Sequence, residues 1–247
     1  MSVPSFTDLE SERQSGINLT LNRAVSTTQE SFEKLQEVVI FKVVDFRKGL
    51  TSANELDYEK IKQHRMKYYK AKAPHLAEEK ELENSHLLDC RSALLALEIN
   101  GEVRVSLRVT PRPFELENFD SHNPNLNSEL FLHLQNYAEL GRLVSDPSLD
   151  QVTAALLTRY ILCLTGLKSF QDWGYEGFVA ICRPFRLSYF KKFGLKEHFT
   201  VYSEQRKLIY HFLSASKVQI LEQTSQLQMN ENYLIKRLKQ SCGDVRK

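Results

Sequence analysis

The dipeptide Asn100-Gly101 lies between two runs of apolar residues, and it restricts the fold more than any other feature of the sequence. Asn-Gly favours the tight turn of a β-hairpin, because both residues tolerate a positive φ. Residues 92–99 and 102–110 are therefore predicted to form two antiparallel strands. The second strand alternates between an apolar and a polar face. Its apolar positions are Val103, Val105, Leu107 and Val109, and its polar positions are Arg104, Ser106 and Arg108.

Strands and helices alternate along the rest of the chain. Short β-branched or apolar runs predict strands at 38–44, 137–145, 178–182, 199–203 and 208–213. Helical spacing predicts helices at 53–72, about 129–134, 149–173, 184–193 and 217–240. Ser52 would cap the first of these, whose apolar positions include Leu56, Ile61, Met66 and Tyr69. A hairpin combined with strand–helix–strand units predicts an α/β (α+β) fold, with a mixed sheet and helices on both faces.

The domain organisation is expected to be simple. Residues 1–27 are rich in Ser, Thr, Asn and Gln and predict a flexible leader, 28–215 a single domain, and 216–247 an amphipathic helix and tail. The apolar stripe of that helix could dock on its own domain, pair with another subunit or lie on a membrane surface. The stripe consists of Leu221, Leu227, Leu234 and Leu238.

Composition narrows the function classes. A net charge of +2 is too small to indicate nucleic-acid binding by charge alone. The residues after 182 include 13 Lys or Arg and 5 Asp or Glu, and this basic part of the chain could attract an acidic partner. The seven histidines have no metal-ligand spacing, so no metal is expected. No apolar run is long enough to span a membrane. Four cysteines without a CxxC pair, and a start that lacks the apolar run of a signal peptide, predict a cytoplasmic protein.

The segment from Tyr137 to Val144 places a carboxylate, Glu139, and a guanidinium, Arg142, three residues apart in an apolar strand. In a regular strand these side chains would point to opposite faces. A bulge at Gly141 would bring them to the same face. Charges inside a sheet are costly unless they are paired or functional, so the two residues are either a structural ion pair or part of a site.

Several segments carry a resemblance to a known family. They are Arg65-Met66-Lys67-Tyr68-Tyr69, the hairpin from Asn100 to Pro111, Glu139-Leu140-Gly141-Arg142, Gly174-Tyr175 and the stretch from Arg186 to Leu195. In this order they resemble GNAT-like acyltransferases of the acyl-carrier-dependent branch, over roughly residues 55 to 200. That branch comprises N-acyl amino acid synthases, ornithine-lipid N-acyltransferases and autoinducer synthases. The resemblance implies a GNAT-like, mostly antiparallel central sheet and transfer of an acyl group from a thioester to an amine.

The resemblance, together with the chemistry of the reaction, gives each candidate residue a role. An amine arrives as an ammonium ion, so a general base is needed, and Glu139 is the candidate. The backbone N–H groups of Leu143 and Val144 would hold the developing oxyanion. Arg65, Arg108 and Arg142 would line the acceptor site, although Arg65 and Arg108 could equally be solvated side chains. Asp89 could pair with one of these arginines.

Departures from the family bear on the substrates. The Trp that autoinducer synthases usually carry after the early helix is missing, and Gly141 replaces their usual Ser, which favours an amino acid or another small amine as acceptor. The turn from Asp146 to Asp150 has no glycine to seat a pyrophosphate, which favours acyl carrier protein over coenzyme A as donor. The basic C-terminal third could contact the carrier. Two alternatives stay open: a coenzyme-A-dependent acetyltransferase and a non-catalytic GNAT-like binding module.

Overall fold

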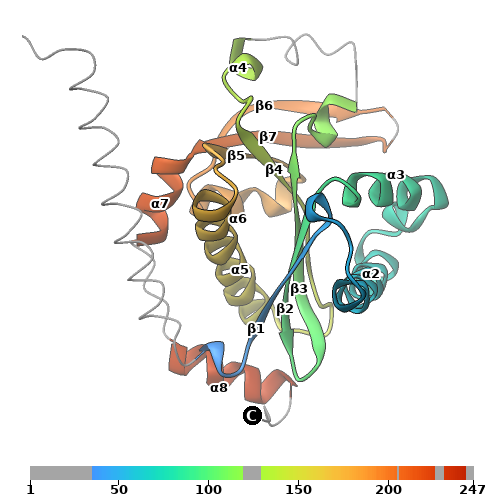
Figure 1. Cartoon of the computed structure of the whole chain (residues 1–247), viewed down its shortest axis with the longest axis vertical. Coiled ribbons are helices and arrows are strands. Elements are labelled where there is room, and N and C mark those ends of the chain that lie inside the picture. Colours follow the sequence, from blue (N-terminus) through green and yellow to red (C-terminus); the bar gives the residue numbers. More distant parts are fainter. Residues whose placement is uncertain (1–34, 119–128, 205, 226–230, 243–247) are drawn as a thin grey trace, which may run out of the picture.

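The computed structural model describes residues 35–118, 129–204, 206–225 and 231–242, and these ranges contain one seven-stranded sheet (Figure 1). The strand order is β1-β2-β3-β4-β5-β7-β6. Only β4 and β5 pair in parallel within this sheet, so the expected mixed, mostly antiparallel sheet is confirmed. The strands are β1 Ile40–Asp45, β2 Ala93–Ile99, β3 Glu102–Pro111, β4 Tyr137–Ser145, β5 Gly177–Cys182, β6 Lys196–Ser203 and β7 Leu208–Ser216.

Helices cover both faces of the sheet, with α2 and α3 on one side and α5, α7 and α8 on the other (Figure 1). The α-helices are α2 Ser52–Lys72, α3 Glu79–Asp89, α4 Glu129–Leu132, α5 Gln151–Asp172, α6 Leu187–Lys192, α7 Lys217–Ser225 and α8 Glu231–Cys242. Short 3-10 helices are η1 Phe46–Lys48, η2 Pro74–Ala77, η3 Glu115–Asn118 and η5 Pro184–Arg186. No helix in the described ranges is both long and apolar enough to cross a bilayer.

The predicted hairpin is confirmed, with Asn100 and Gly101 at φ values of 54° and 80°. The predicted alternation of apolar and polar residues along β3 is wrong at one position. A bulge places Arg104 between the pairs Val103–Glu98 and Val105–Leu97, which reverses the alternation there. Val105 consequently packs in the core under α5, whereas Val103 packs on the opposite face with the residues of α2.

The early helix and its successor differ from the prediction in detail. Thr51, rather than Ser52, caps α2, and Leu56 is 64% exposed although its apolar character suggested burial. The acidic run that begins at Glu78 forms α3, which was not predicted. This second helix covers the polar face of β3. The polar face of the hairpin is therefore buried rather than solvated.

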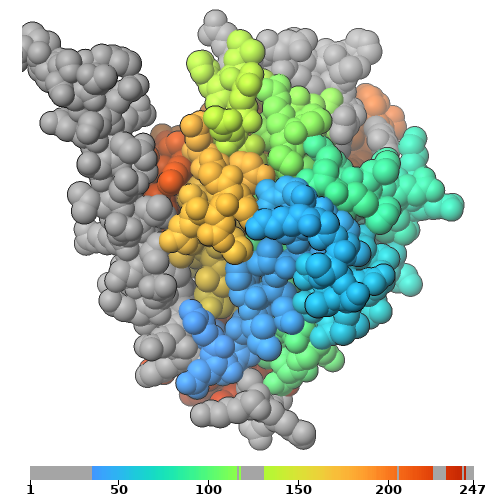
Figure 2. Space-filling model, viewed as in Figure 1, coloured from blue at the N-terminus to red at the C-terminus, as the bar shows by residue number. Residues whose placement is uncertain are grey.

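The C-terminal segment forms two described helices, α7 and α8, where a single helix was expected. Leu221, Leu234 and Leu238 are buried in the core cluster that includes α5, while Leu227 lies outside the described residues. Of the three possibilities for the stripe, these residues take the first, packing on their own chain. On another part of the surface, η1 lies against the end of α5, where the Arg47 guanidinium lies 4.3 Å from the centroid of the Trp173 ring. In Figure 2 the blue N-terminal part of the described chain borders the gold segment on this face.

The parallel pair β4–β5 opens partway along its length. The strands pair from Tyr137–Gly177 to Leu140–Ala180 and then separate, while β4 continues to pair with β3. A Cβ atom at Gly177 would collide with the Tyr137 ring and the Ala215 carbonyl, so the paired end requires a glycine. The open end has no such contact between the strands, and it forms the wall of a pocket.

Candidate active site

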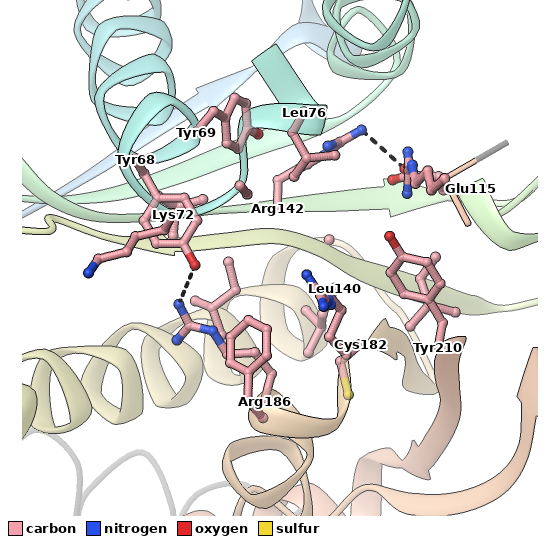
Figure 3. Close-up of a pocket in the computed structure, with 18 of the residues that line it drawn as sticks. Tyr68, Tyr69, Lys72, Leu76, Glu115, Leu140, Arg142, Cys182, Arg186 and Tyr210 are labelled. Carbon is pink, nitrogen blue, oxygen red and sulfur yellow. Dashed lines mark hydrogen bonds and ion pairs between the residues drawn. The ribbon is translucent and has the colours of Figure 1, made fainter. Parts of the chain in front are cut away.

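A pocket of about 130 Å³ lies where β4 and β5 separate. Residues from Glu139 to Val144 form one wall, the ends of β5 and η5 another, and α2 and η2 the roof. Tyr210 of β7 closes one end (Figure 3). The motif that stood out in the sequence therefore lines a pocket built from four distant parts of the chain.

Glu139 lies on the wall of this pocket and is 1% exposed. Its Oε2 atom accepts a hydrogen bond from the backbone N–H of Glu115, and its Oε1 atom has no partner among the described residues. Burial, together with the neighbouring Glu115 carboxylate, raises the pKa of Glu139 to about 7. A carboxyl group with one free oxygen and a pKa near neutrality can exchange a proton with a ligand.

Glu115, the neighbour of Glu139, differs from it in its hydrogen-bond partners. Its own carboxylate accepts hydrogen bonds from three guanidinium groups, at 2.6 Å from Arg108, 3.1 Å from Arg142 and 2.7 Å from Arg206. Burial alone would raise the pKa of Glu115, but these arginines hold it well below its usual range. The two glutamates lie side by side with pKa values pushed in opposite directions, an arrangement typical of acid–base sites.

Arg142 reaches this cluster because of a bulge in β4. Arg142 and Leu143 together lie opposite Leu107 of β3, and Arg142 has a φ of 52°. The bulge was expected at Gly141 and occurs one residue later. The Arg142 guanidinium pairs with Glu115 at 3.1 Å and with Glu81 at 3.6 Å, so Glu115 lies between it and Glu139.

Arg65 and Arg108 were predicted to line the acceptor site, and they lie instead in a buried ion-pair network. Arg65 is 3% exposed and its Nη1 atom lies 3.0 and 2.9 Å from the two oxygens of Asp89. Arg108 is fully buried and pairs with Asp89 and Glu115. Asp89 thus contacts both arginines. Neither arginine lines the pocket, and buried carboxylates match the charge of both.

The sequence did not point to Glu81, Glu115 or Arg206. Arg206, between β6 and β7, bonds both oxygens of Glu81 at 3.1 and 2.7 Å and also reaches Glu115. These residues come from a helix, a 3-10 turn and a hairpin that are far apart in the chain. No local motif marks them, since their only shared signal is a charge next to an apolar run. Cys182 also lines the pocket, where burial raises the pKa of its thiol to about 12 and keeps it protonated.

Leu143 and Val144, the predicted oxyanion-binding positions, line the pocket beyond the last β4–β5 pair. The turn that follows them is acidic. Asp150 caps α5 by accepting hydrogen bonds from the N–H groups of Val152 and Thr153. Burial opposes it, but hydrogen bonds from Ser148 and Lys67 hold the pKa of Asp146 below its usual range. The helix terminus where a pyrophosphate would bind therefore already holds a carboxylate.

Comparison with known proteins agrees with the fold. No protein-family model and no curated protein matches the chain. Among solved structures, an uncharacterized protein from Bacillus halodurans is 17% identical with a TM-score of 0.50, covering 78% of this chain and 91% of that one. FeeM, an N-acyl amino acid synthase from uncultured soil microbes, is 12% identical with a TM-score of 0.47, over 78% and 96%. An acyl-CoA N-acyltransferase from Pseudomonas aeruginosa is 13% identical with a TM-score of 0.47, over 70% and 97%. At these identities the likeness concerns the fold alone.

Proposed function

We propose that this chain is an N-acyltransferase that moves an acyl group from a thioester to the amine of a small molecule such as an amino acid. The observation that carries the proposal is the Glu139 carboxyl at the opening between β4 and β5. It lines the pocket, has one oxygen without a partner among the described residues and has a pKa raised to about 7. This combination supports a general base that works near neutral pH.

In the proposed reaction, Glu139 Oε1 accepts a proton from the substrate ammonium. The amine nitrogen then attacks the thioester carbonyl carbon and a C–N bond forms. As the C–S bond breaks, a second proton of the nitrogen passes to the sulfur, which leaves as a thiol, and Glu139 releases its proton to solvent. The developing oxyanion would be held by backbone N–H groups at Leu143 and Val144, in the part of β4 that β5 no longer covers. Arg142 contributes indirectly, because its ion pair fixes Glu115, whose N–H holds Glu139.

The pocket volume and the α5 terminus bear on the substrates. The pocket of about 130 Å³ has room for a small amine and the thioester carbonyl. Asp150 already occupies the N–H groups of Val152 and Thr153 at the start of α5, which a pyrophosphate would need. We therefore favour acyl carrier protein as the donor, with coenzyme A as the alternative.

Intact-mass detection of acyl transfer tests the proposal. The purified protein is mixed with a panel of amino acids and other amines, and with either long-chain acyl carrier protein or acyl-coenzyme A. One acyl group gained by an amine, with the carrier donor only, supports the proposal in full, and turnover with acyl-coenzyme A moves the donor to the alternative. A folded protein that is silent with both donors contradicts acyl transfer and leaves the non-catalytic module.

A further inference from the structure

The cations that line the pocket divide into two groups by their partners. Arg142 and Arg206 both pair with Glu81 and Glu115. Lys72, Arg183 and Arg186 line the same pocket and have no carboxylate partner in the described part of the chain. One region of the wall therefore carries positive charge that the described residues do not neutralise.

Aromatic rings hold the two arginines of this region in place. The Arg186 guanidinium lies 5.5 Å from the Tyr189 ring and 6.0 Å from the Tyr68 ring, and it donates a 3.3 Å hydrogen bond to the Tyr68 hydroxyl. The Arg183 guanidinium lies 5.6 Å from the Phe185 ring. Rings orient a guanidinium through its face and leave its edge free for an anion.

Arg183 is also partly removed from water. Its Nε atom is buried and has no hydrogen-bond partner among the described residues. Burial, and after it the positive charge of Arg183, lowers the pKa of His75 in the roof of the pocket, so Arg183 lies near η2 across the opening. The Arg183 Nε–H group has lost water and gained no acceptor among the described residues, and an oxygen of a ligand could supply one.

Two of the cations without a described carboxylate partner, Lys72 and Arg186, lie at the end of the pocket away from Glu115. Figure 3 shows Tyr68, Lys72 and Arg186 at one end, and Glu115 and Tyr210 at the other. Glu139 accepts its hydrogen bond from Glu115 and so belongs to the second end. A ligand could therefore place an ammonium group against the Glu139 carboxyl, whose Oε1 atom has no described partner, and an anionic group against the cations without a described carboxylate partner.

From this geometry we propose that Arg183 and Arg186 bind an oxyanion of a substrate, either a carboxylate or a phosphate group. The guanidinium fork matches both groups in the same way. The carboxylate would belong to an amino acid acceptor, and the phosphate to the phosphopantetheine arm of the donor. The choice between these two substrates rests on the proposed acyl transfer. The anion site itself does not, since it is defined by the two arginines and their rings.

The first experiment measures anion binding without catalysis. The Tm is recorded in acetate, in inorganic phosphate and in chloride at equal ionic strength, for the wild type and for Arg183→Gln, Arg186→Gln and Arg159→Gln. Arg159 is an exposed arginine of α5 outside this pocket, and its variant is the matched control. We expect acetate or phosphate to raise the Tm of the wild type and the control but not of the two pocket variants. An equal response in all four proteins, or none in the wild type, overturns the proposal.

The second experiment identifies the molecule that carries the anion. In the acyl-transfer assay, loss of either arginine is expected to raise one KM by roughly 10- to 100-fold, with kcat little changed. An increase for the acceptor assigns the carboxylate, and an increase for the donor assigns the phosphate. Unchanged values for both overturn the proposal. If the anion response depends on Arg183 and Arg186 but no acyl donor is used, the anion site stands and the proposed reaction fails.

Discussion

The arginines near the pocket form two groups that differ in what surrounds their charge. Arg65 and Arg108 are buried against Asp89, and Arg108 also meets Glu115, so their charge is matched inside the protein. Arg183 and Arg186 are surrounded by aromatic rings and a tyrosine hydroxyl, and no described carboxylate matches their charge. The first arrangement joins a helix to a sheet, and the second leaves binding capacity for a ligand.

The same contrast separates the two glutamates at the centre of the site. Glu115 has three arginine partners and stays ionised, whereas Glu139 has one backbone donor and a raised pKa. Both carboxyl groups are buried, so burial does not distinguish them. The number of ion-pair partners among the described residues does: the glutamate with three has a structural role, and the glutamate with none is available for proton transfer. The contrast predicts that changes in the first group lower stability and changes in the second lower activity.

The largest effect is expected from Glu139→Gln, which keeps the shape of the side chain and removes the base. Acyl transfer should fall by about 10²- to 10⁴-fold, while the free energy of unfolding at neutral pH stays close to that of the wild type. Rates from intact-mass time courses and urea denaturation measure the two quantities. Glu98→Gln, at a buried glutamate paired with Lys60 away from the pocket, is the control and should keep its rate. A Glu139→Gln variant that keeps the full rate removes Glu139 from the mechanism.

Asp89→Asn should affect stability instead. It leaves Arg65 and Arg108 buried with one negative charge fewer, which is expected to cost about 3–5 kcal/mol in the free energy of unfolding. Arg183→Gln, which breaks no described ion pair, should change that free energy by less than about 0.5 kcal/mol. Urea denaturation compares the two variants. Equal losses would mean that the two groups of arginines do not differ as described.

The pH dependence of the reaction should follow the raised pKa of Glu139. Below a pH of about 7 the base is protonated, so the rate should fall about tenfold for each further pH unit. Stability changes in the opposite sense, because the native state holds this proton more tightly than the unfolded chain. The contribution of Glu139 is fully present below the pKa of an ordinary glutamate, about 4.3, and is lost as the pH rises through about 7.

Two measurements check this prediction. The inflection near pH 7 should be missing from the residual activity of the Glu139→Gln protein, whose rate then follows only the deprotonation of the substrate amine at higher pH. The stability of the wild type relative to that variant should decrease as the pH rises from about 4.3 to about 7. A stability difference that is the same at both ends of this range would contradict a raised pKa for Glu139.

The smallest effect is expected at Asp150, which accepts hydrogen bonds from the N–H groups of Val152 and Thr153 and pairs with Arg237, a pair that both variants below remove. Asp150→Ala removes the cap of α5 and should lower the free energy of unfolding by about 1 kcal/mol. Asp150→Ser keeps a cap and should lose less. Thermal unfolding of the two variants measures the difference, and the result is contradicted if Ser is as costly as Ala.

Much of the sheet could be predicted because its signals are local. The Asn100-Gly101 turn and the ends of β4 follow from neighbouring residues alone, and all of them are as expected. Helix α3 was missed because its sequence is dominated by charges, and its buried side chains include Glu81 and Asp89 rather than a continuous apolar stripe. The side chain of Val103 was assigned to the wrong face because no local signal marks a bulge at Arg104.

The candidate site was predicted only in part, for a related reason. Glu139 and Arg142 stand out because charges are unusual inside a strand, and the pocket does contain both. Arg65 and Arg108 carry the same charge as Arg183 and Arg186, and the sequence alone does not show which of them meets a carboxylate. That distinction depends on where α3 lies, since Asp89 at its end matches the first two.

The contact between Arg206 and Glu81 has a consequence for how the protein is made. The two residues are 125 positions apart, so α3 leaves the ribosome long before the arginine that will hold it. Contacts of such separation form late and slowly, because a long loop must close first. A nascent chain therefore carries Glu81 and Glu115 without Arg206 until the last hairpin has been synthesised. We expect the pocket to be assembled only then, so that an incomplete chain cannot start the reaction.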